Sequence, residues 1–448
     1  MISLEEYEIP HGWTLTRLSE DLIVDIQPGF ACGKNTRDGR GIPHLRPMNV
    51  TDKGEINLTD LKFVPESEST KSEKFVQNGD ILFNNTNSPD LVGKTAYYDL
   101  QDPRAFSNHM TRLRCNIEII DPKFCAMYIH QKWREGYFKT VCNNHVSQSS
   151  VSRNILLETP VLLPPLSEQH RIVARVEALL SQINAARDRL NRVPLIMKRF
   201  RQAVLAAACR GRLTEGWREE NPDVNIGFDE NVEIENPCFW DIPDNWQWTE
   251  ICRICEQIVD CPHSTPKWTA SGKICIRTSE IKPFYLDLSQ ARFVSDETFH
   301  ERTQRLEPTE GDIVYSREGT LGQAAIIPKG VKICLGQRIM LLRSGSHCSP
   351  FFLMYVINSP QILKIVNELK TGSTSPHINV GDVKKLPIPL PQLAEQQEIV
   401  RRVDALFALA DQIEQQVADA SKRTEALTQA VLAKAFQGEL VTQGDDLI

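Results

Sequence analysis

One stretch of this chain occurs twice, 227 residues apart. The sequence "LPPLSEQHRIVARVEALL" covers residues 163–180, and "LPQLAEQQEIVRRVDALF" covers residues 390–407. The two copies agree again, without a gap, over residues 202–213 and 429–440. Two unrelated segments would not match by chance at one fixed offset over some fifty residues. The period is also far longer than the 20–50 residues of solenoid repeats, so we interpret it as one internal duplication.

The segments before the two copies also match, but more faintly. "NGDIL" (78–82) corresponds to "EGDIV" (310–314), and "LVGKTAYY" (91–98) to "TLGQAAII" (320–327). The order is therefore variable segment, shared segment, variable segment, shared segment. We expect a globule over residues 1–160, a helix over 161–215, a linker over 216–237, a second globule over 238–389, a second helix over 390–440 and a tail over 441–448.

Both shared segments carry apolar residues at alternating spacings of four and three, a period of 3.5 residues. This pattern predicts the seam of a coiled coil, although an amphipathic helix packed on an ordinary core remains the alternative. Gly211 and Gly438 stand where the helices should end, and Pro194 should kink the first. The residues expected to pair the helices are Ile172, Val176, Leu179, Ile183 and Leu190 in the first copy, and Ile399, Val403, Leu406, Ile413 and Val417 in the second.

Charge indicates which helix pairs with which. Residues 161–217 contain ten Lys and Arg against four Asp and Glu, whereas residues 390–448 contain five against ten. Each helix would repel a copy of itself, at a few tenths of a kcal/mol per like-charged pair (about 0.2–0.5) summed over many turns. We therefore expect the two helices of one chain to pair with each other.

The variable segments look like mixed α+β globules. Short apolar strands are expected at residues 81–83, 313–315 and 339–342, and a short helix at 352–358. The stretch 219–237 is acidic and rich in turn formers, as is typical of a surface linker.

Polar, basic and small residues cluster in the expected loops of both globules. Arg, Lys, Asn, Gln, Ser and Thr are the side chains that contact base edges and phosphates, although for any one residue an ordinary solvated loop is the simpler explanation. The candidates for DNA binding are Lys34, Arg37, Arg40, Asn84, Asn85, Thr86, Asn143, Ser147 and Gln148 in the first globule, and His263, Lys267, Arg277, Ser316, Arg317, Thr371, Ser373, Thr374 and His377 in the second.

Net charge does not by itself indicate a nucleic-acid partner. The whole chain carries −7, and a protein that binds DNA alone is usually basic. If this chain binds DNA, partner proteins should supply most of the phosphate contacts.

Sequence signatures of catalysis are lacking. "SPDLVGKT" (88–95) has Ser88 where a P-loop needs glycine, and the motifs of zinc proteases, serine hydrolases and dinucleotide-binding folds do not occur. Cys252, Cys255, Cys261 and His263 could form part of a zinc site, but the first copy has Ser19 and Leu22 opposite Cys252 and Cys255, which favours buried structural thiols. The start of the chain does not resemble a signal peptide, and no apolar run reaches the ~20 residues that span a membrane, so a cytoplasmic protein is expected.

Two diverged globules joined by two matched helices resemble the specificity subunit of Type I restriction-modification enzymes. The resemblance covers essentially the whole chain. It is strongest in the repeated segments quoted above, in "LIMKRFRQAVLAAACRGRLTEGWREE" (195–220) and in "GDIVYSREGTLGQAAI" (311–326), and it is closest to the enterobacterial group of such subunits.

The resemblance implies a fold and a function. It implies two target recognition domains of α+β fold, separated by two long helices that form an antiparallel coiled coil, with a pseudo-two-fold repeat. Each domain would read one half of a split, asymmetric site in double-stranded DNA, and the helices would hold two modification subunits of a bacterial complex that two restriction subunits complete. The chain itself would not be an enzyme and would bind no cofactor, because S-adenosylmethionine, ATP and Mg²⁺ would belong to those partners. The alternative is a coiled-coil adaptor whose two globules do not contact DNA.

Overall fold

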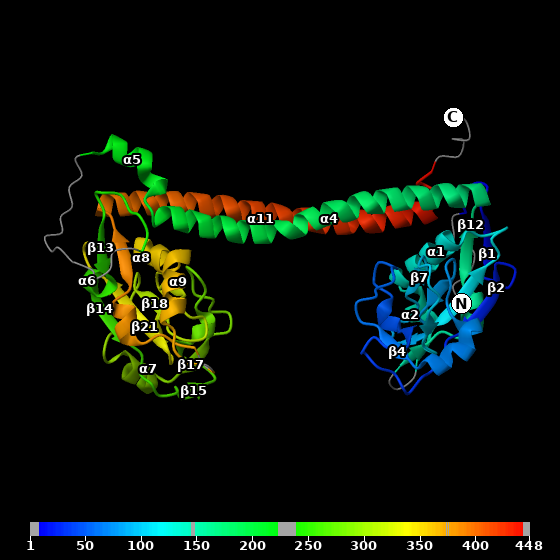
Figure 1. The fold of residues 1–448 in the computed structure, drawn as a ribbon, viewed down its shortest axis with the longest axis horizontal. Coiled ribbons are helices and arrows are strands. Elements are labelled where there is room, and N and C mark those ends of the chain that lie inside the picture. Colours follow the sequence, from blue (N-terminus) through cyan, green and yellow to red (C-terminus); the bar gives the residue numbers. More distant parts are fainter. Residues whose placement is uncertain (1–8, 145–147, 223–238, 373, 375, 442–448) are drawn as a thin grey trace. The chain divides into compact units, whose positions relative to one another are not determined.

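The chain divides into two compact units, each built from one globule and parts of two long helices (Figure 1). The structure is a computed structural model that describes residues 9–144, 148–222, 239–372, 374 and 376–441. The first unit comprises residues 1–190 and 419–448, and the second comprises residues 191–418. The long helices are α4 (Leu166–Ala208) and α11 (Leu393–Phe436), and the boundary between the units crosses both.

The first globule is built on a four-stranded antiparallel sheet of order β2-β9-β5-β7, beside a three-stranded sheet of order β4-β3-β8 and a small sheet of order β10-β11-β6. The apolar strand expected at residues 81–83 is β5, fully buried at the centre of the first sheet. The strands are β2 (Ile23–Pro28), β3 (Ile42–Leu45), β4 (Lys62–Val64), β5 (Ile81–Phe83), β6 (Thr86–Asn87), β7 (Thr95–Tyr97), β8 (Ala105–Phe106), β9 (Thr111–Cys115), β10 (Asn143–Asn144) and β11 (Ser149–Ser150). The helices are η2 (Pro47–Asn49), η3 (Glu66–Lys74), α1 (Pro122–Arg134), α2 (Tyr137–Val141) and α3 (Arg153–Leu157).

The second globule repeats this plan, with sheets of order β14-β21-β18-β19 and β15-β17-β16-β20. The expected strands at 313–315 and 339–342 and the expected helix at 352–358 are confirmed as β18, β21 and α8. The strands are β14 (Cys255–Asp260), β15 (Trp268–Thr269), β16 (Lys273–Ile276), β17 (Arg292–Val294), β18 (Ile313–Ser316), β19 (Ala324–Ile326), β20 (Ile333–Leu335) and β21 (Ile339–Ser344). The helices are α6 (Ile251–Ile254), η5 (Thr278–Glu280), α7 (Asp296–Thr303), α8 (Pro350–Ile357), α9 (Pro360–Leu369) and α10 (Val380–Lys384).

In each globule the first and last strands pair antiparallel and return the chain to the start of a long helix. β1 (Thr14–Arg17) pairs with β12 (Pro160–Leu163) just before α4. β13 (Gln247–Glu250) pairs with β22 (Pro387–Leu390) just before α11. The four-stranded sheets β2-β9-β5-β7 and β14-β21-β18-β19 are therefore equivalent in strand order, as the duplication predicts, and β4-β3-β8 corresponds to β17-β16-β20, to which the second globule adds β15.

Each globule packs its core against both long helices. In the first unit, the start of α4 contributes Ile172 and Val176, and the end of α11 contributes Phe436, whose ring centroid lies 5.6 Å from that of Phe124. In the second unit, the start of α11 and the end of α4 contribute in the same way: the buried residues are Ile399, Val403, Val204, Leu205, Ala208 and Cys209. The helices are thus part of the two globular cores as well as a link between them.

Within each unit the helices run antiparallel, and ion pairs join the basic helix to the acidic one. Arg187 Nη2 lies 2.8 Å from Glu425 Oε2 in the first unit. Arg201 lies 2.8 Å from Glu414 Oε1 and 2.5 Å from Asp411 Oδ1 in the second. The antiparallel coiled coil and the pairing of unlike charges are both as expected.

The residues predicted to pair the helices differ in burial along the seam. Ile172, Val176, Ile399 and Val403 are buried, where the helices meet the globules. The remaining six are half-buried, as expected for the seam of a coiled coil of only two helices: Leu179, Ile183, Leu190, Leu406, Ile413 and Val417.

Glycines end both helices. Gly211 and Gly438 have φ of 69° and 75°, which a residue without a Cβ adopts easily. A Cβ on Gly211 would lie 2.4 Å from Pro243 Cγ, and one on Gly438 would lie 2.8 Å from Pro10 Cβ. Pro194 lies inside α4, which continues through it as one helix. A further short helix, α5 (Glu215–Glu220), occupies the start of the expected linker.

The start of each long helix carries the same glutamate–tryptophan bond. Trp13 Nε1 donates to Glu168 Oε1 at 3.0 Å, and Trp246 Nε1 donates to Glu395 Oε2 at 2.9 Å. These are equivalent positions in the two copies, and both carboxylates are buried.

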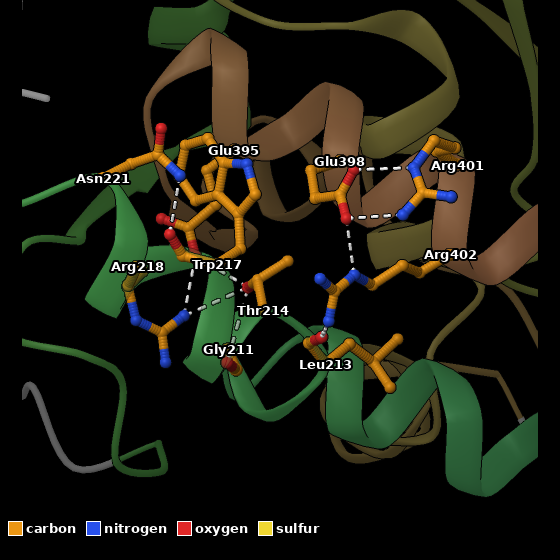
Figure 2. A network of polar contacts seen from close by, with 10 residues as sticks. All are labelled: Gly211, Leu213, Thr214, Trp217, Arg218, Asn221, Glu395, Glu398, Arg401 and Arg402. Atoms are coloured by element: carbon orange, nitrogen blue, oxygen red, sulfur yellow. Dashed lines mark hydrogen bonds and ion pairs between the residues drawn. The ribbon is translucent and has the colours of Figure 1, made fainter.

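The second copy adds a polar network to this bond (Figure 2). Glu395 also accepts hydrogen bonds from Thr214 Oγ1 at 2.7 Å and from Arg218 Nη1 at 2.6 Å. Two turns further along α11, Arg402 donates to Glu398 and to the carbonyl of Leu213. The segment after α4 is thereby fixed to the start of α11. The guanidinium groups of Arg401 and Arg402 lower the pKa of Glu398 to about 2.

A substitution in the seam tests whether the helices support the globules. Leu406 packs against the buried core of the second globule, whereas Leu409 on the same helix is exposed. We expect Leu406→Asp to lower the free energy of unfolding by about 2–4 kcal/mol, because a carboxylate would replace apolar packing. Leu409→Asp is the matched control and should change it by less than about 0.5 kcal/mol. Urea unfolding measures both, and equal effects would mean that the seam does not stabilise the globule.

No helix of the described part of the chain is both long enough and apolar enough to cross a membrane.

Candidate nucleic-acid interface

The second globule has an open polar cavity of about 370 Å³. Four chain segments line it: the residue three positions after β14, the two residues after β18, the two residues before β21 and the stretch that leads into α10. Its lining residues are His263, Arg317, Glu318, Gln337, Arg338, His377 and Asn379. Three of these, His263, Arg317 and His377, are among the residues predicted to bind DNA.

Arg317 holds these segments together. Its guanidinium binds both carboxylate oxygens of Asp260, with Nε 3.1 Å from Oδ1 and Nη2 3.2 Å from Oδ2. Nη1 also donates to the carbonyl of Ile378 at 3.2 Å. The side chain is only 11% exposed. Arg317 was expected to reach outwards from a loop; the structure instead gives it an internal role, because a partner 57 residues away in the sequence binds its charge.

The exposed polar groups of the cavity surround this ion pair. His263 Nε2 lies 3.3 Å from Asp260 Oδ2 and its side chain is 76% exposed. Arg338 Nη1 lies 2.5 Å from Glu318 Oε1. Burial raises the pKa of the neighbouring Cys261 thiol, which favours the uncharged form of this core residue. The cavity therefore offers hydrogen-bond donors of both imidazole and guanidinium type.

Three further candidates also have partners within the protein: Asn84 and Ser316 are buried, and Arg277 is half-buried. Asn84 is buried and its Nδ2 donates to the carbonyl of Pro47 at 3.0 Å. Ser316 is buried and its hydroxyl donates to the carbonyl of Glu318. Arg277 stands directly before the short helix η5 and forms an ion pair with Glu280, the last residue of that helix. In each case the polar group has a partner within the protein, so its presence in a polar run did not indicate a free side chain.

The other described candidates lie at or near the surface. Asn85 and Thr86 lie at the small sheet of the first globule. Ser150 of β11 is the central residue there: Thr86 of β6 pairs with it on one side and Asn143 of β10 on the other. The exposed candidates are Lys34, Arg37, Arg40, Asn143, Gln148, Lys267, Thr371 and Thr374. Ser147 and Ser373 lie outside the described residues.

Sequence reasoning missed Gln337 and Arg338. Both stand between β20 and the buried strand β21, in the run "LGQRIMLL" (335–342). A polar pair directly before a strongly apolar strand indicates that both residues lie at a sheet end. That was the available indication.

The described residues include no group of three or more histidine, cysteine, aspartate or glutamate side chains arranged to hold a metal ion. Of the cysteines considered as zinc ligands, Cys252 is exposed, Cys255 is half-buried and Cys261 is buried, with its sulfur accepting the Ile339 N–H at 3.4 Å.

Comparison with known proteins identifies the family. The model of the "Type I restriction modification DNA specificity domain" matches residues 10–195 and 264–420, which is most of the chain. The chain therefore belongs to the family of Type I restriction-modification specificity subunits, the DNA-recognition components of these systems.

Similar proteins include two specificity subunits of Escherichia coli. The chain is 30% identical to that of the Type I restriction enzyme EcoBI, with 95% of this chain and 86% of the relative covered. It is 28% identical to that of EcoKI from strain K12, with 97% and 91% covered. Among solved structures, the HsdS subunit from Thermoanaerobacter tengcongensis has the same fold, with a TM-score of 0.61 and 20% identity over 97% of this chain and 99% of that one.

Proposed function

We propose that each globule reads one half of a split, asymmetric site in double-stranded DNA. The observation that carries this proposal is that the main sheets of the two globules share their strand order but carry different polar residues in equivalent loops: His377, for example, stands where the first copy has Ser150. A shared frame with different side chains can present two different patterns of donors and acceptors to two sequences.

The paired helices set the distance between the half-sites and hold two modification subunits. Continuous helices of 43 and 44 residues support this role, because each extends for about 65 Å at 1.5 Å per residue. The segments most alike between the copies are the helix starts and ends, as expected for two docking surfaces that take two identical partners. Two restriction subunits would complete the assembly.

Catalysis belongs to the partner subunits in this proposal. S-adenosylmethionine would be bound by the modification subunits, and ATP and Mg²⁺ would serve the restriction subunits. The chain itself supplies sequence recognition and assembly. Its net charge of −7 supports this division, because neutralisation of DNA phosphates would then fall largely on the partners.

The assignment is tested by methyl transfer. The purified chain with DNA and S-adenosylmethionine should transfer no methyl groups, because it supplies recognition alone. Addition of the modification subunit should produce adenine methylation at one split motif. Long-read sequencing of DNA from cells that carry both proteins gives the motif. Methyl transfer by the isolated chain would contradict the non-catalytic role, and a complex that neither binds nor modifies DNA would favour the adaptor.

A further inference from the structure

The cavity of the second globule is organised by two backbone hydrogen bonds. The N–H of Arg317 donates to the carbonyl of Arg338 at 3.0 Å, and the carbonyl of Arg317 accepts from the N–H of Ile378 at 3.1 Å. These bonds join the end of β18 to the segment before β21 and to the segment before α10. We call this meeting point the second junction.

The first globule contains the same pair of bonds. The N–H of Asn85 donates to the carbonyl of His109 at 3.1 Å, and the carbonyl of Asn85 accepts from the N–H of Val151 at 2.9 Å. This first junction joins the end of β5 to the segment before β9 and to the segment before α3. Asn85, His109 and Val151 thus correspond to Arg317, Arg338 and Ile378.

Strand pairing gives the same correspondence independently. β3 pairs with β8 in parallel so that Leu45 faces Phe106, and β16 pairs with β20 in parallel so that Ile276 faces Leu335. Phe106 and Leu335 are therefore equivalent positions. Residues 108 and 109 lie two and three positions after Phe106, and residues 337 and 338 lie two and three positions after Leu335. The backbone hydrogen bonds at the junctions are therefore shared, although Arg338 has a positive φ and His109 does not.

The side chains on this shared frame differ at every polar position. The first junction carries Asn85, Asn108, His109 and Ser150, and the second carries Arg317, Gln337, Arg338 and His377. In a protein whose duplicated halves keep the starts and ends of their long helices alike, different donor and acceptor groups on one frame are the feature expected of residues that discriminate between ligands.

Arg338 is held in a conformation that an ordinary residue seldom adopts. Its φ is 69°, and among the described residues only Phe284 shares a positive φ without being glycine. Such a conformation is unfavourable for a residue with a Cβ and persists where the surroundings impose it, often at functional sites. Glu318, itself 12% exposed, binds one edge of the guanidinium, while the Arg338 side chain is 57% exposed. A guanidinium fixed in this way loses little freedom when it binds a second partner.

We propose that Arg338 and Gln337 read bases of one half-site, that His109 and Asn108 do so for the other, and that Arg317 is a positioning residue. The proposal rests on the proposed function, since it names the residues by which each globule discriminates DNA. Arg317 acts through Asp260 and through its backbone bonds, which hold the Gln337–Arg338 segment at the mouth of the cavity.

The test uses the full chain with its modification subunit and a DNA library randomised in both half-sites. Arg338→Gly removes the side chain at a position whose φ suits glycine, so the melting temperature should be unchanged or higher. We expect the preference at one base pair of one half-site to fall roughly 10- to 100-fold, with the other half-site read as before. His109→Ala should relax one position of the opposite half-site. Lys364→Ala is the control: it removes a charge from α9 that is 78% exposed and does not line the cavity, and it should change no preference.

The role of Arg317 is tested in the same library. Arg317→Lys keeps the charge but not the two-point geometry with Asp260, and it should relax the same base pair as Arg338→Gly, with no change in the other half-site. A merely structural role would lower the melting temperature without moving that one preference.

Two results would overturn the proposal. One is an unchanged motif with Arg338→Gly; the other is a uniform loss of affinity over all sequences with a salt dependence reduced by about one unit, which identifies a phosphate contact. Failure of the proposed function is distinguishable from both, because the wild-type complex would then show no sequence preference at all.

Discussion

Glu395→Ala is expected to lower the stability of the second unit by about 3–5 kcal/mol, because it removes a buried acceptor from a half-buried guanidinium and two further donors. Arg218, Thr214 and Trp246 all donate to this carboxylate, whose side chain is 1% exposed. The equivalent Glu168→Ala in the first unit should cost about 1–3 kcal/mol.

The difference between the two substitutions follows from the duplication. Glu168 accepts from Trp13, but Val441 stands at the position equivalent to Thr214, and the acidic residue Asp445 stands in the sequence at that of Arg218. Removal of Glu168 therefore leaves fewer polar groups unsatisfied in the part of the unit that the structure describes.

Hydrogen exchange separates the two effects by location. Glu395→Ala should increase exchange in the first turns of α11 and at the end of α4, whereas Glu168→Ala should act at the start of α4. Glu395→Gln is the isosteric control, which keeps one acceptor and should have an intermediate effect. Equal losses from Glu395→Ala and Glu168→Ala would show that the additional network in Figure 2 contributes nothing to stability.

The sequence predicted the elements of the fold because each depends on local pattern. The 3.5-residue repeat of apolar residues and the two glycines predicted α4 and α11. Both signals are local: the repeat depends on residues three and four positions apart, and the positive φ after each helix depends on a single glycine. Apolar runs such as residues 313–315 likewise identified the central strands. The charge difference between the copies also predicted which helix pairs with which, because it sums over many positions.

The recognition site could be predicted only in part, because its geometry depends on distant partners. The sequence shows Arg317 among polar neighbours, but its guanidinium binds Asp260, which stands at the end of another strand. Conversely, Arg338 precedes an apolar strand, yet its side chain is exposed and its backbone adopts a positive φ. Neither property can be seen in a window of adjacent residues. The side-chain contacts and backbone angles of the second globule show both, and the backbone hydrogen bonds identify the equivalent positions of the first.

A half-chain of residues 238–448 should form a homodimer rather than a folded monomer. It contains the second globule and α11 but lacks α4, whose residues Val204, Leu205, Ala208 and Cys209 are buried in the core of that globule. The end of α11 carries the equivalent residues Val431, Leu432, Ala435 and Phe436, so α11 of a second copy can fill the gap. Two like globules should then lie at the two ends of a symmetric helix pair.

Charge should make this homodimer weak, and one substitution should strengthen it. In the intact chain Arg187 faces Glu425; at the position equivalent to Arg187 the second copy has Glu414, so two glutamates would face each other in the homodimer. Glu414→Arg should therefore tighten the half-chain dimer by roughly 3- to 10-fold, within the range that ion pairs on helices provide. In the intact chain the same change removes the partner of Arg201 and should weaken the helix pair. Sedimentation measures the first effect and thermal unfolding the second; effects of the same sign in both would contradict the antiparallel exchange of helices.

The half-chain also tests which residues read which half-site. With both ends carrying the second globule, the complex with modification subunits should methylate an inverted repeat of the half-site that Arg338 controls, because recognition moves with the globule. The spacer should stay near its original length, because α11 has 44 residues and α4 has 43. An asymmetric motif that retains the half-site of the missing globule would contradict the model, since the bases of that half would then be read by residues of α11 or of the second globule.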